Sequence, residues 1–186
     1  MTNIVVSATS LTTAKWINSA LLAVSALTFC LSAATPVHAN PHRIALLGVQ
    51  FENDNEGYQP ATDAERSRMK SVYKAFEKML TESGKYTFIP VPHSEQQKIE
   101  AGQLLGACGG CEFDYGRALK AERVAWIQIQ KVSNLILNMN VYIVDVSERR
   151  ATFSHSVDLR NNTDESWFRG INYLVRNYLL PASHGF

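Results

Sequence analysis

Apolar and polar positions along residues 40–186 divide this part of the chain into nine predicted elements. Residues 43–51 form a nearly continuous apolar run, which indicates a strand covered on both faces. Thr62 and Glu65 form a capping-box pair that opens a helix, and Gly84 ends it. The pattern then predicts a strand over 86–91, a polar helix over 94–105 and a short helix over 112–121.

The pattern changes to a period of two in the second half of the chain, which is typical of half-buried strands. Residues 124–132, 135–146 and 151–159 alternate in this way and are joined by short polar turns, so they predict an antiparallel meander. A helix follows from about residue 163, with Trp167 as a core anchor and Asn162 with Glu165 at its cap.

The element order is therefore β-α-β-α-α-β-β-β-α. It predicts one α/β (α+β) domain, in which a mixed sheet with a C-terminal antiparallel meander is packed by helices in three layers.

Residues 1–39 have the composition of a secretory signal peptide. Lys15 precedes an apolar run over 16–34, and Val37 and Ala39 stand at the positions that signal peptidases read before a cut at Asn40. An uncleaved membrane anchor is the alternative, but polar residues interrupt the run and Pro36 breaks it. We expect an exported, periplasmic protein, residues 40–186, with no stable membrane insertion after cleavage. The full chain has a net charge of only +1, which gives no basis for binding nucleic acid.

Cys108 and Cys111 flank two glycines and precede a predicted helix. Two thiols three positions apart in an exported protein favour a structural disulfide that braces the turn. The alternative is thiol–disulfide exchange, because a helix N-terminus lowers the pKa of a thiol. Haem attachment is excluded by Glu112, which stands where a histidine would be required.

The polar segment over 52–63 has acidic residues with the spacing of a calcium-binding loop. They are Glu52, Asp54, Glu56 and Asp63, and Gly57 occupies the sixth position. Glu52 replaces the usual aspartate, Pro60 disturbs the second half and a strand leads in, so we expect a solvated connector. A small metal-binding module that uses this segment remains the alternative.

A row of amide side chains on the meander is the candidate binding surface. Its members on the strands are Gln128, Gln130, Asn138 and Asn140, and the flanking loops add Asn134, Arg160, Asn162 and Asp164. Such residues dock partners when a rigid scaffold positions them. The alternative is that the row is the wet side of a sheet and that the loop residues serve as turns and caps.

Three motifs of this chain resemble those of a family of small exported proteins of unknown function. That family lies within the TolB N-terminal-domain and CsgG-like superfamily. The motifs lie at 107–111 (ACGGC), 130–138 (QKVSNLILN) and 158–167 (DLRNNTDESW). The resemblance spans about residues 43–181 and implies a single TolB N-terminal-like domain that acts through protein contacts, without catalytic residues. It also implies an association with periplasmic quinoprotein alcohol dehydrogenases, because members are often encoded near them.

No nucleophile elbow or glycine-rich phosphate loop occurs in the sequence. We therefore expect a non-enzymatic periplasmic accessory protein that binds a protein partner and holds no cofactor.

Overall fold

The computed structural model describes residues 40–53, 57 and 60–182. The predicted signal peptide lies outside the described residues. The elements are β1 (His42–Asn53), α1 (Asp63–Glu82), β2 (Tyr86–Phe88), α2 (His93–Ala101), α3 (Cys111–Ala118), β3 (Arg123–Lys131), β4 (Ile136–Asp145), β5 (Arg150–Arg160), α4 (Asp164–Leu174), a π-helical turn (Val175–Leu179) and α5 (Leu180–Ala182). The predicted order of strands and helices is confirmed.

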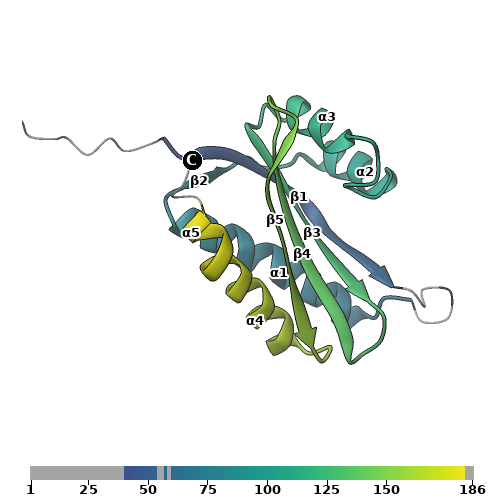
Figure 1. Cartoon of the computed structure of the whole chain (residues 1–186). Coiled ribbons are helices and arrows are strands. Elements are labelled where there is room, and N and C mark those ends of the chain that lie inside the picture. Colours follow the sequence, from purple (N-terminus) through teal and green to yellow (C-terminus); the bar gives the residue numbers. More distant parts are fainter. Residues whose placement is uncertain (1–39, 54–56, 58–59, 183–186) are drawn as a thin grey trace, which may run out of the picture. The chain divides into compact units, whose positions relative to one another are not determined.

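One mixed five-stranded sheet forms the centre of the domain, with strand order β2-β1-β3-β4-β5. β1 pairs in parallel with β2 and with β3, whereas β3, β4 and β5 form the predicted antiparallel meander. Figure 1 shows α1 and α4 along one face of the sheet, and α2 and α3 on the other face near one end. The predicted single domain with three layers is confirmed.

Each layer of helices covers its own apolar core. The core under α1 and α4 contains Leu46, Phe76, Ile127, Met139 and Trp167, all buried. The core under α2 and α3 contains Leu47, Ile99, Phe113 and Trp126. Because side chains alternate along a strand, neighbours such as Leu46 and Leu47 enter different cores. This explains the continuous apolar run of β1.

The capping box of α1 is present as predicted. Thr62 Oγ1 accepts a hydrogen bond from the Glu65 N–H (3.2 Å), and Glu65 Oε2 accepts one from the Thr62 N–H (2.7 Å). α4 is capped by Thr163, whose side chain accepts from the Ser166 N–H, and not by Asn162 as the sequence suggested. The side chain of Asn162 is engaged elsewhere, as described below.

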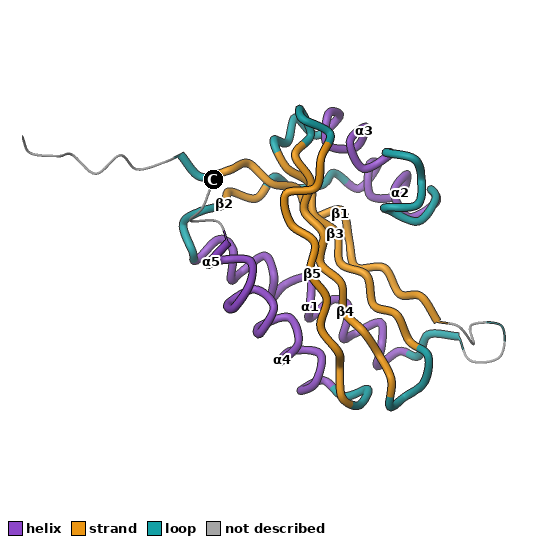
Figure 2. The backbone as a smooth tube through the Cα atoms, in the orientation of Figure 1, coloured by secondary structure: helices purple, strands orange, loops and turns teal. Residues whose placement is uncertain are grey.

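Two predicted elements are shorter than expected. β2 ends at Phe88 although the sequence predicted a strand to residue 91, because Pro90 has no N–H to donate to a ladder. α2 ends at Ala101 rather than at residue 105. β1 therefore extends far beyond its short neighbour, and a loop over 102–110 lies between α2 and α3 (Figure 2).

Candidate functional site

Polar side chains of the meander and of β1 lie together on the part of the sheet that α2 and α3 leave uncovered. We call them the polar face, and they are Glu52, Gln128, Gln130, Asn138, Asn140, Ser156 and Asp158. The strand register places Gln130 opposite Asn138, and Asn138 opposite Asp158. Figure 1 shows that α2 and α3 sit at the other end of these strands. The sheet therefore brings together the predicted row from β3 and β4, and it adds Ser156 and Asp158 from β5 and Glu52 from β1.

Hydrogen bonds connect the polar face across the strands. Glu52 accepts from the side-chain amides of Gln128 and Gln130. Asn140 Nδ2 donates to Gln130 Oε1 (3.3 Å). Asn138 Nδ2 donates to Asp158 Oδ1 (3.2 Å), and its Oδ1 accepts from Ser156 Oγ (2.9 Å). The amides therefore hold one another in defined orientations and present an ordered surface.

The polar face is not uniformly open. Gln130, Ser156 and Asp158 are exposed, but Gln128 and Asn140 are each only 9% exposed. A charge placed at Asn140 would therefore be largely removed from water, and one placed at Asn138 would stand beside Asp158. Accessible contact is offered by the outer members of the row.

A cluster of exposed apolar side chains adjoins the polar face at the turn between β3 and β4. We call Val132, Leu135 and Ile136 the hairpin tip; they are 51%, 73% and 61% exposed. Strand alternation puts Val132 on the side of Gln130, and Ile136 on the side of Asn138. Sequence reasoning assigned these residues to strands and missed them as a surface. The available signal was that Val132 and Ile136 are apolar at positions of the polar register and that Leu135 is an apolar residue in the turn.

The hairpin tip is fixed to the rest of the domain through a buried ion pair. Lys131 Nζ donates to Glu65 Oε1 (2.7 Å), and their side chains are 6% and 1% exposed. Glu65 also accepts from Thr62 and from Asn162 Nδ2 (2.7 Å). Burial raises the pKa of Glu65, but the hydrogen bonds from Lys131, Thr62 and Asn162 outweigh it and lower this pKa to about 2.

Three of the four predicted loop residues belong to the surroundings of this ion pair. Asn162 accepts from Trp167 Nε1 (3.0 Å) and donates to Asn134 Oδ1 (3.2 Å). Asp164 Oδ1 accepts from Arg68 Nε (2.6 Å). Arg160 is exposed at the end of β5. The side chains of Asn134, Asn162 and Asp164 thus tie the β3–β4 turn to α1 and α4.

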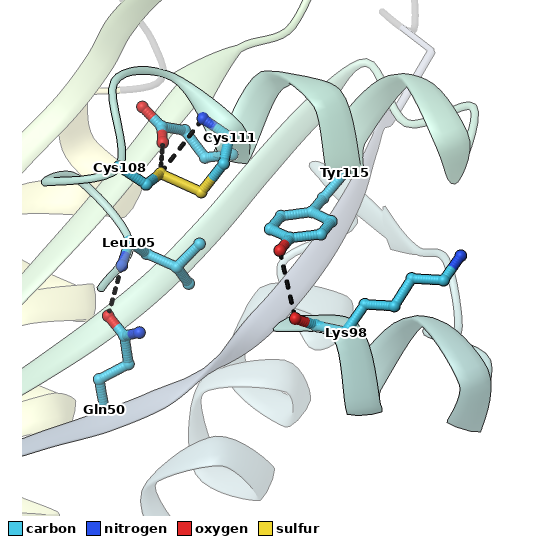
Figure 3. The surroundings of a disulfide bond; sticks show 7 residues. Gln50, Lys98, Leu105, Cys108, Cys111 and Tyr115 are labelled. Atoms are coloured by element: carbon cyan, nitrogen blue, oxygen red, sulfur yellow. Dashed lines mark hydrogen bonds between the residues drawn. A yellow bond between two sulfur atoms is a disulfide. The ribbon is translucent and has the colours of Figure 1, made fainter. Parts of the chain in front are cut away.

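Cys108 and Cys111 form the predicted disulfide. Gly109 and Gly110 have φ of +71° and +107°, a left-handed conformation that favours glycine. Figure 3 shows one contact before the disulfide turn and one after it: the Leu105 N–H donates to Gln50 Oε1 (3.2 Å), and Tyr115 Oη of α3 donates to the Lys98 carbonyl of α2 (3.3 Å). The disulfide therefore braces a turn whose neighbouring segments are attached to β1 and α2.

A buried carboxylate touches the disulfide. Glu112 is 7% exposed, and its Oε2 lies 3.1 Å from Cys108 Sγ. Within the described ranges, these two cysteines with Glu112 are the group of potential metal ligands that lies close enough together to hold an ion. Both sulfur atoms are bonded to each other, so they are not available as thiolate ligands.

The proposed metal-binding segment is only partly described. Glu52 lies in β1 and accepts from two amides, and Asp63 pairs with Arg66 at the start of α1. Asp54 and Glu56 lie outside the described residues. The two described carboxylates are thus each engaged by other side chains.

None of the helices in the described part of the chain has the length and apolar character that a bilayer span requires.

Several solved structures resemble this fold at low sequence identity. The LpoB C-terminal domain from Salmonella enterica is 12% identical, with a TM-score of 0.45 over 68% of this chain and 88% of that one. Lipoprotein GNA1162 from Neisseria meningitidis is 15% identical, with a TM-score of 0.48 over 78% and 99%. TolB from Acinetobacter baumannii is 16% identical, with a TM-score of 0.46 over 79% of this chain and 29% of TolB.

No curated protein sequence matches the chain. The profile of one protein family matches residues 42–179, from the first residue of β1 to the end of the π-helical turn. The match includes the polar face, the hairpin tip and the disulfide loop. The chain therefore belongs to the family DUF3280, described as "Protein of unknown function (DUF2380)".

Proposed function

We propose that this protein is an exported, non-enzymatic accessory protein that binds a protein partner through the hairpin tip and the adjoining polar face. One observation carries the proposal: Val132, Leu135 and Ile136 are large, apolar and more than half exposed on a turn that is held rigidly. Clustered apolar exposure is unfavourable in water and is typical of surfaces that are covered by a partner.

The arrangement has the composition of a protein interface. The hairpin tip supplies an apolar centre, and the amides and hydroxyl of the polar face supply neutral donors and acceptors beside it. Interfaces commonly combine an apolar core with a polar rim, and neutral amides are desolvated at lower cost than charges. The ion pair of Glu65 and Lys131 below the tip keeps the turn in place, so little conformational entropy is lost on binding.

An N-terminal segment of signal-peptide composition supports export, and the disulfide of Cys108 and Cys111 suits an oxidising compartment. The periplasm is the compartment that we propose. A quinoprotein alcohol dehydrogenase, the enzyme class that the sequence resemblance implies, is the first candidate partner to test. The protein itself needs no cofactor for this role.

Affinity capture with a purified bait from a periplasmic extract tests the proposal. The informative variant is Leu135→Ser with Ile136→Ser, because exposed substitutions change the free energy of unfolding by only about 0.5 kcal/mol or less. We expect the variant to melt like the parent protein and to lose the partner that the parent captures, identified by mass spectrometry.

Phe168→Ser is the matched control, since Phe168 is also large, apolar and 56% exposed but lies on α4, which packs on the opposite face of the sheet from Val132 and Ile136. It should retain the partner. If the tip variant and the control capture the same protein equally well, the proposed surface is wrong. Capture by neither parent nor control would also contradict a role in stable protein binding.

Thiol–disulfide exchange is the second candidate function, because Glu112 contacts Cys108 Sγ at 3.1 Å. In the reduced protein, this carboxylate would be placed to take the proton of the Cys108 thiol, and the thiolate is the form that attacks a client disulfide. Reduction of insulin disulfides by the protein after its own disulfide has been reduced with dithiothreitol, with Cys108 and Cys111 oxidised back to the disulfide, slowed in Glu112→Gln but not in Asp114→Asn, would establish this activity. Absence of insulin reduction in the parent protein would reject it.

A further inference from the structure

The outer edge of β1 is covered by another strand only at its beginning. β2 pairs with His42, Arg43 and Ile44, and the Ile89 N–H donates to the Ile44 carbonyl (2.8 Å). From there to Asn53, β1 pairs with β3 on its inner side, and no strand of the described chain lies on its outer side. Alternate residues of a strand direct their N–H and C=O groups to each edge, so residues 47–51 of this stretch present a row of backbone donors and acceptors outward.

A groove of about 760 Å³ follows this edge. Residues 47–51 of β1 form its base, α1 forms one wall, and α2 with the loop after it forms the other. Met69 and Tyr73 line the α1 side, and Leu104 and Leu105 line the loop side. Tyr73 Oη donates to the Leu46 carbonyl (3.3 Å), which marks where the edge enters the groove. The groove therefore combines apolar walls with a strand edge as its base.

The α1 wall is positively charged. Arg66, Lys70 and Lys74 follow one another at intervals of four residues, which places them on one side of the helix, and all three line the groove. Arg66 pairs with Asp63, whereas no ion pair joins Lys70 or Lys74 to a described residue. Glu100 is the acidic residue on the opposite wall. An occupant with carboxylates facing α1 would match this charge.

We propose that this groove binds an extended peptide segment of another protein, added as a strand beside β1, with apolar side chains toward the walls and acidic side chains toward Lys70 and Lys74. Backbone hydrogen bonds to the edge would hold such a segment, and the walls would select its side chains. This site is separate from the hairpin tip, so the protein would contact two segments or two partners.

A display library of linear peptides of roughly nine residues, about the length of a strand, tests the proposal on the purified protein. We expect enrichment of sequences that alternate apolar with acidic residues, and amide chemical-shift changes at residues 47–51 on binding. Methylation of the peptide nitrogens, one at a time, should weaken binding about three- to ten-fold at every second position and little at the others. That period of two is specific to strand pairing.

Lys70→Glu with Lys74→Glu should weaken the selected peptides at least about ten-fold, since opposite charges are replaced by like charges. Lys78→Glu is the control, because Lys78 is an exposed lysine of α1 outside the groove. Failure to select peptides, methylation effects without the period of two, or equal binding by both variants would overturn the proposal. Self-association of the protein that protects residues 47–51 would overturn it as well, by assigning the edge to a second copy.

Discussion

The ion pair of Glu65 and Lys131 is almost completely removed from water, and every oxygen of the carboxylate has a donor. Oε1 accepts from Lys131 and Asn162, and Oε2 accepts from the backbone and hydroxyl of Thr62. Removing one partner of such a pair leaves a buried charge without compensation, which is strongly unfavourable. Glu65 therefore stabilises both the start of α1 and the end of β3.

Glu65→Gln should lower the free energy of unfolding by about 3–5 kcal/mol, because Lys131 then remains charged, buried and unpaired. Urea denaturation near neutral pH measures the loss. Glu165→Gln is the control, since Glu165 is an exposed residue of α4 that pairs only with Arg169 among the described contacts. If both variants unfold at the same urea concentration, the ion pair does not contribute as described.

The same carboxylate makes stability depend on pH in the acid range. The pKa of Glu65 is about 2 in the folded protein, against an ordinary value of 4.5, so the unfolded chain takes up the proton more readily. Its contribution, on the order of 3 kcal/mol, is complete above pH about 4.5, declines as the pH falls and is lost below about 2. The parent protein should therefore lose more stability between these pH values than Glu65→Gln does. If the parent protein and Glu65→Gln lose the same stability over this pH range, the pH dependence does not come from Glu65.

At the scale of elements, α4 lies unusually close to the sheet. Trp167 is buried in the core beneath α4, and Gly170 faces β5 so closely that an added Cβ would overlap Leu159. The indole also donates to Asn162, so the helix is anchored by apolar contact and by one hydrogen bond. Substitutions of Trp167 can separate the contributions of these two interactions to the free energy of unfolding.

Trp167→Ala should lower the free energy of unfolding by about 3–5 kcal/mol, because it leaves a cavity between α4 and the sheet. Trp167→Phe keeps most of the apolar volume and removes the hydrogen bond to Asn162, so it should cost clearly less. Thermal and urea unfolding measure both. A Phe variant as unstable as the Ala variant would show that the hydrogen bond, and not the packing, anchors the helix.

The disulfide loop is an element-scale feature with little influence on the sheet. Cys108→Ser with Cys111→Ser should cost about 2 kcal/mol or less, because a short loop gains little from being closed. Hydrogen exchange should become faster over residues 102–111 and remain unchanged in β3 and β4. Faster exchange throughout the sheet would show that the disulfide supports the whole domain.

At the scale of the whole molecule, the two helical layers cover unequal parts of the sheet. α1 and α4 extend along one face, whereas α2 and α3 cover only one end of the other (Figure 1). The remainder of that face carries the polar row, and the short β2 leaves the edge of β1 open. Both proposed binding surfaces thus follow from incomplete coverage of one sheet.

The protein isolated from its native host should begin at or near Asn40, because Val37 and Ala39 occupy the positions that define a signal-peptidase cut. Intact-mass analysis measures this directly. A mass that retains residues 1–39, or a lipid attached to Cys30, would contradict the predicted processing.

The sequence was sufficient for features that depend on local pattern. The alternation of residues 124–159 predicted the meander and the facing row of amides, and Thr62 with Glu65 predicted the start of α1. Two cysteines three positions apart and the predicted compartment also pointed to the disulfide. These properties follow from the periods of strands and helices and from caps, which involve residues close in sequence.

Only the tertiary structure decided which polar side chains are buried and hydrogen-bonded within the protein, and which surfaces stay exposed to solvent. The local sequence does not show that Glu65 forms an ion pair with Lys131, or that Asn162 donates a hydrogen bond to Glu65 instead of capping α4. It also does not show that Gln128 and Asn140 are nearly buried. The same holds for the open edge of β1, which depends on how few residues of β2 pair with it. Burial and pairing are set by contacts between segments far apart in sequence, and a period along the chain carries no information about them.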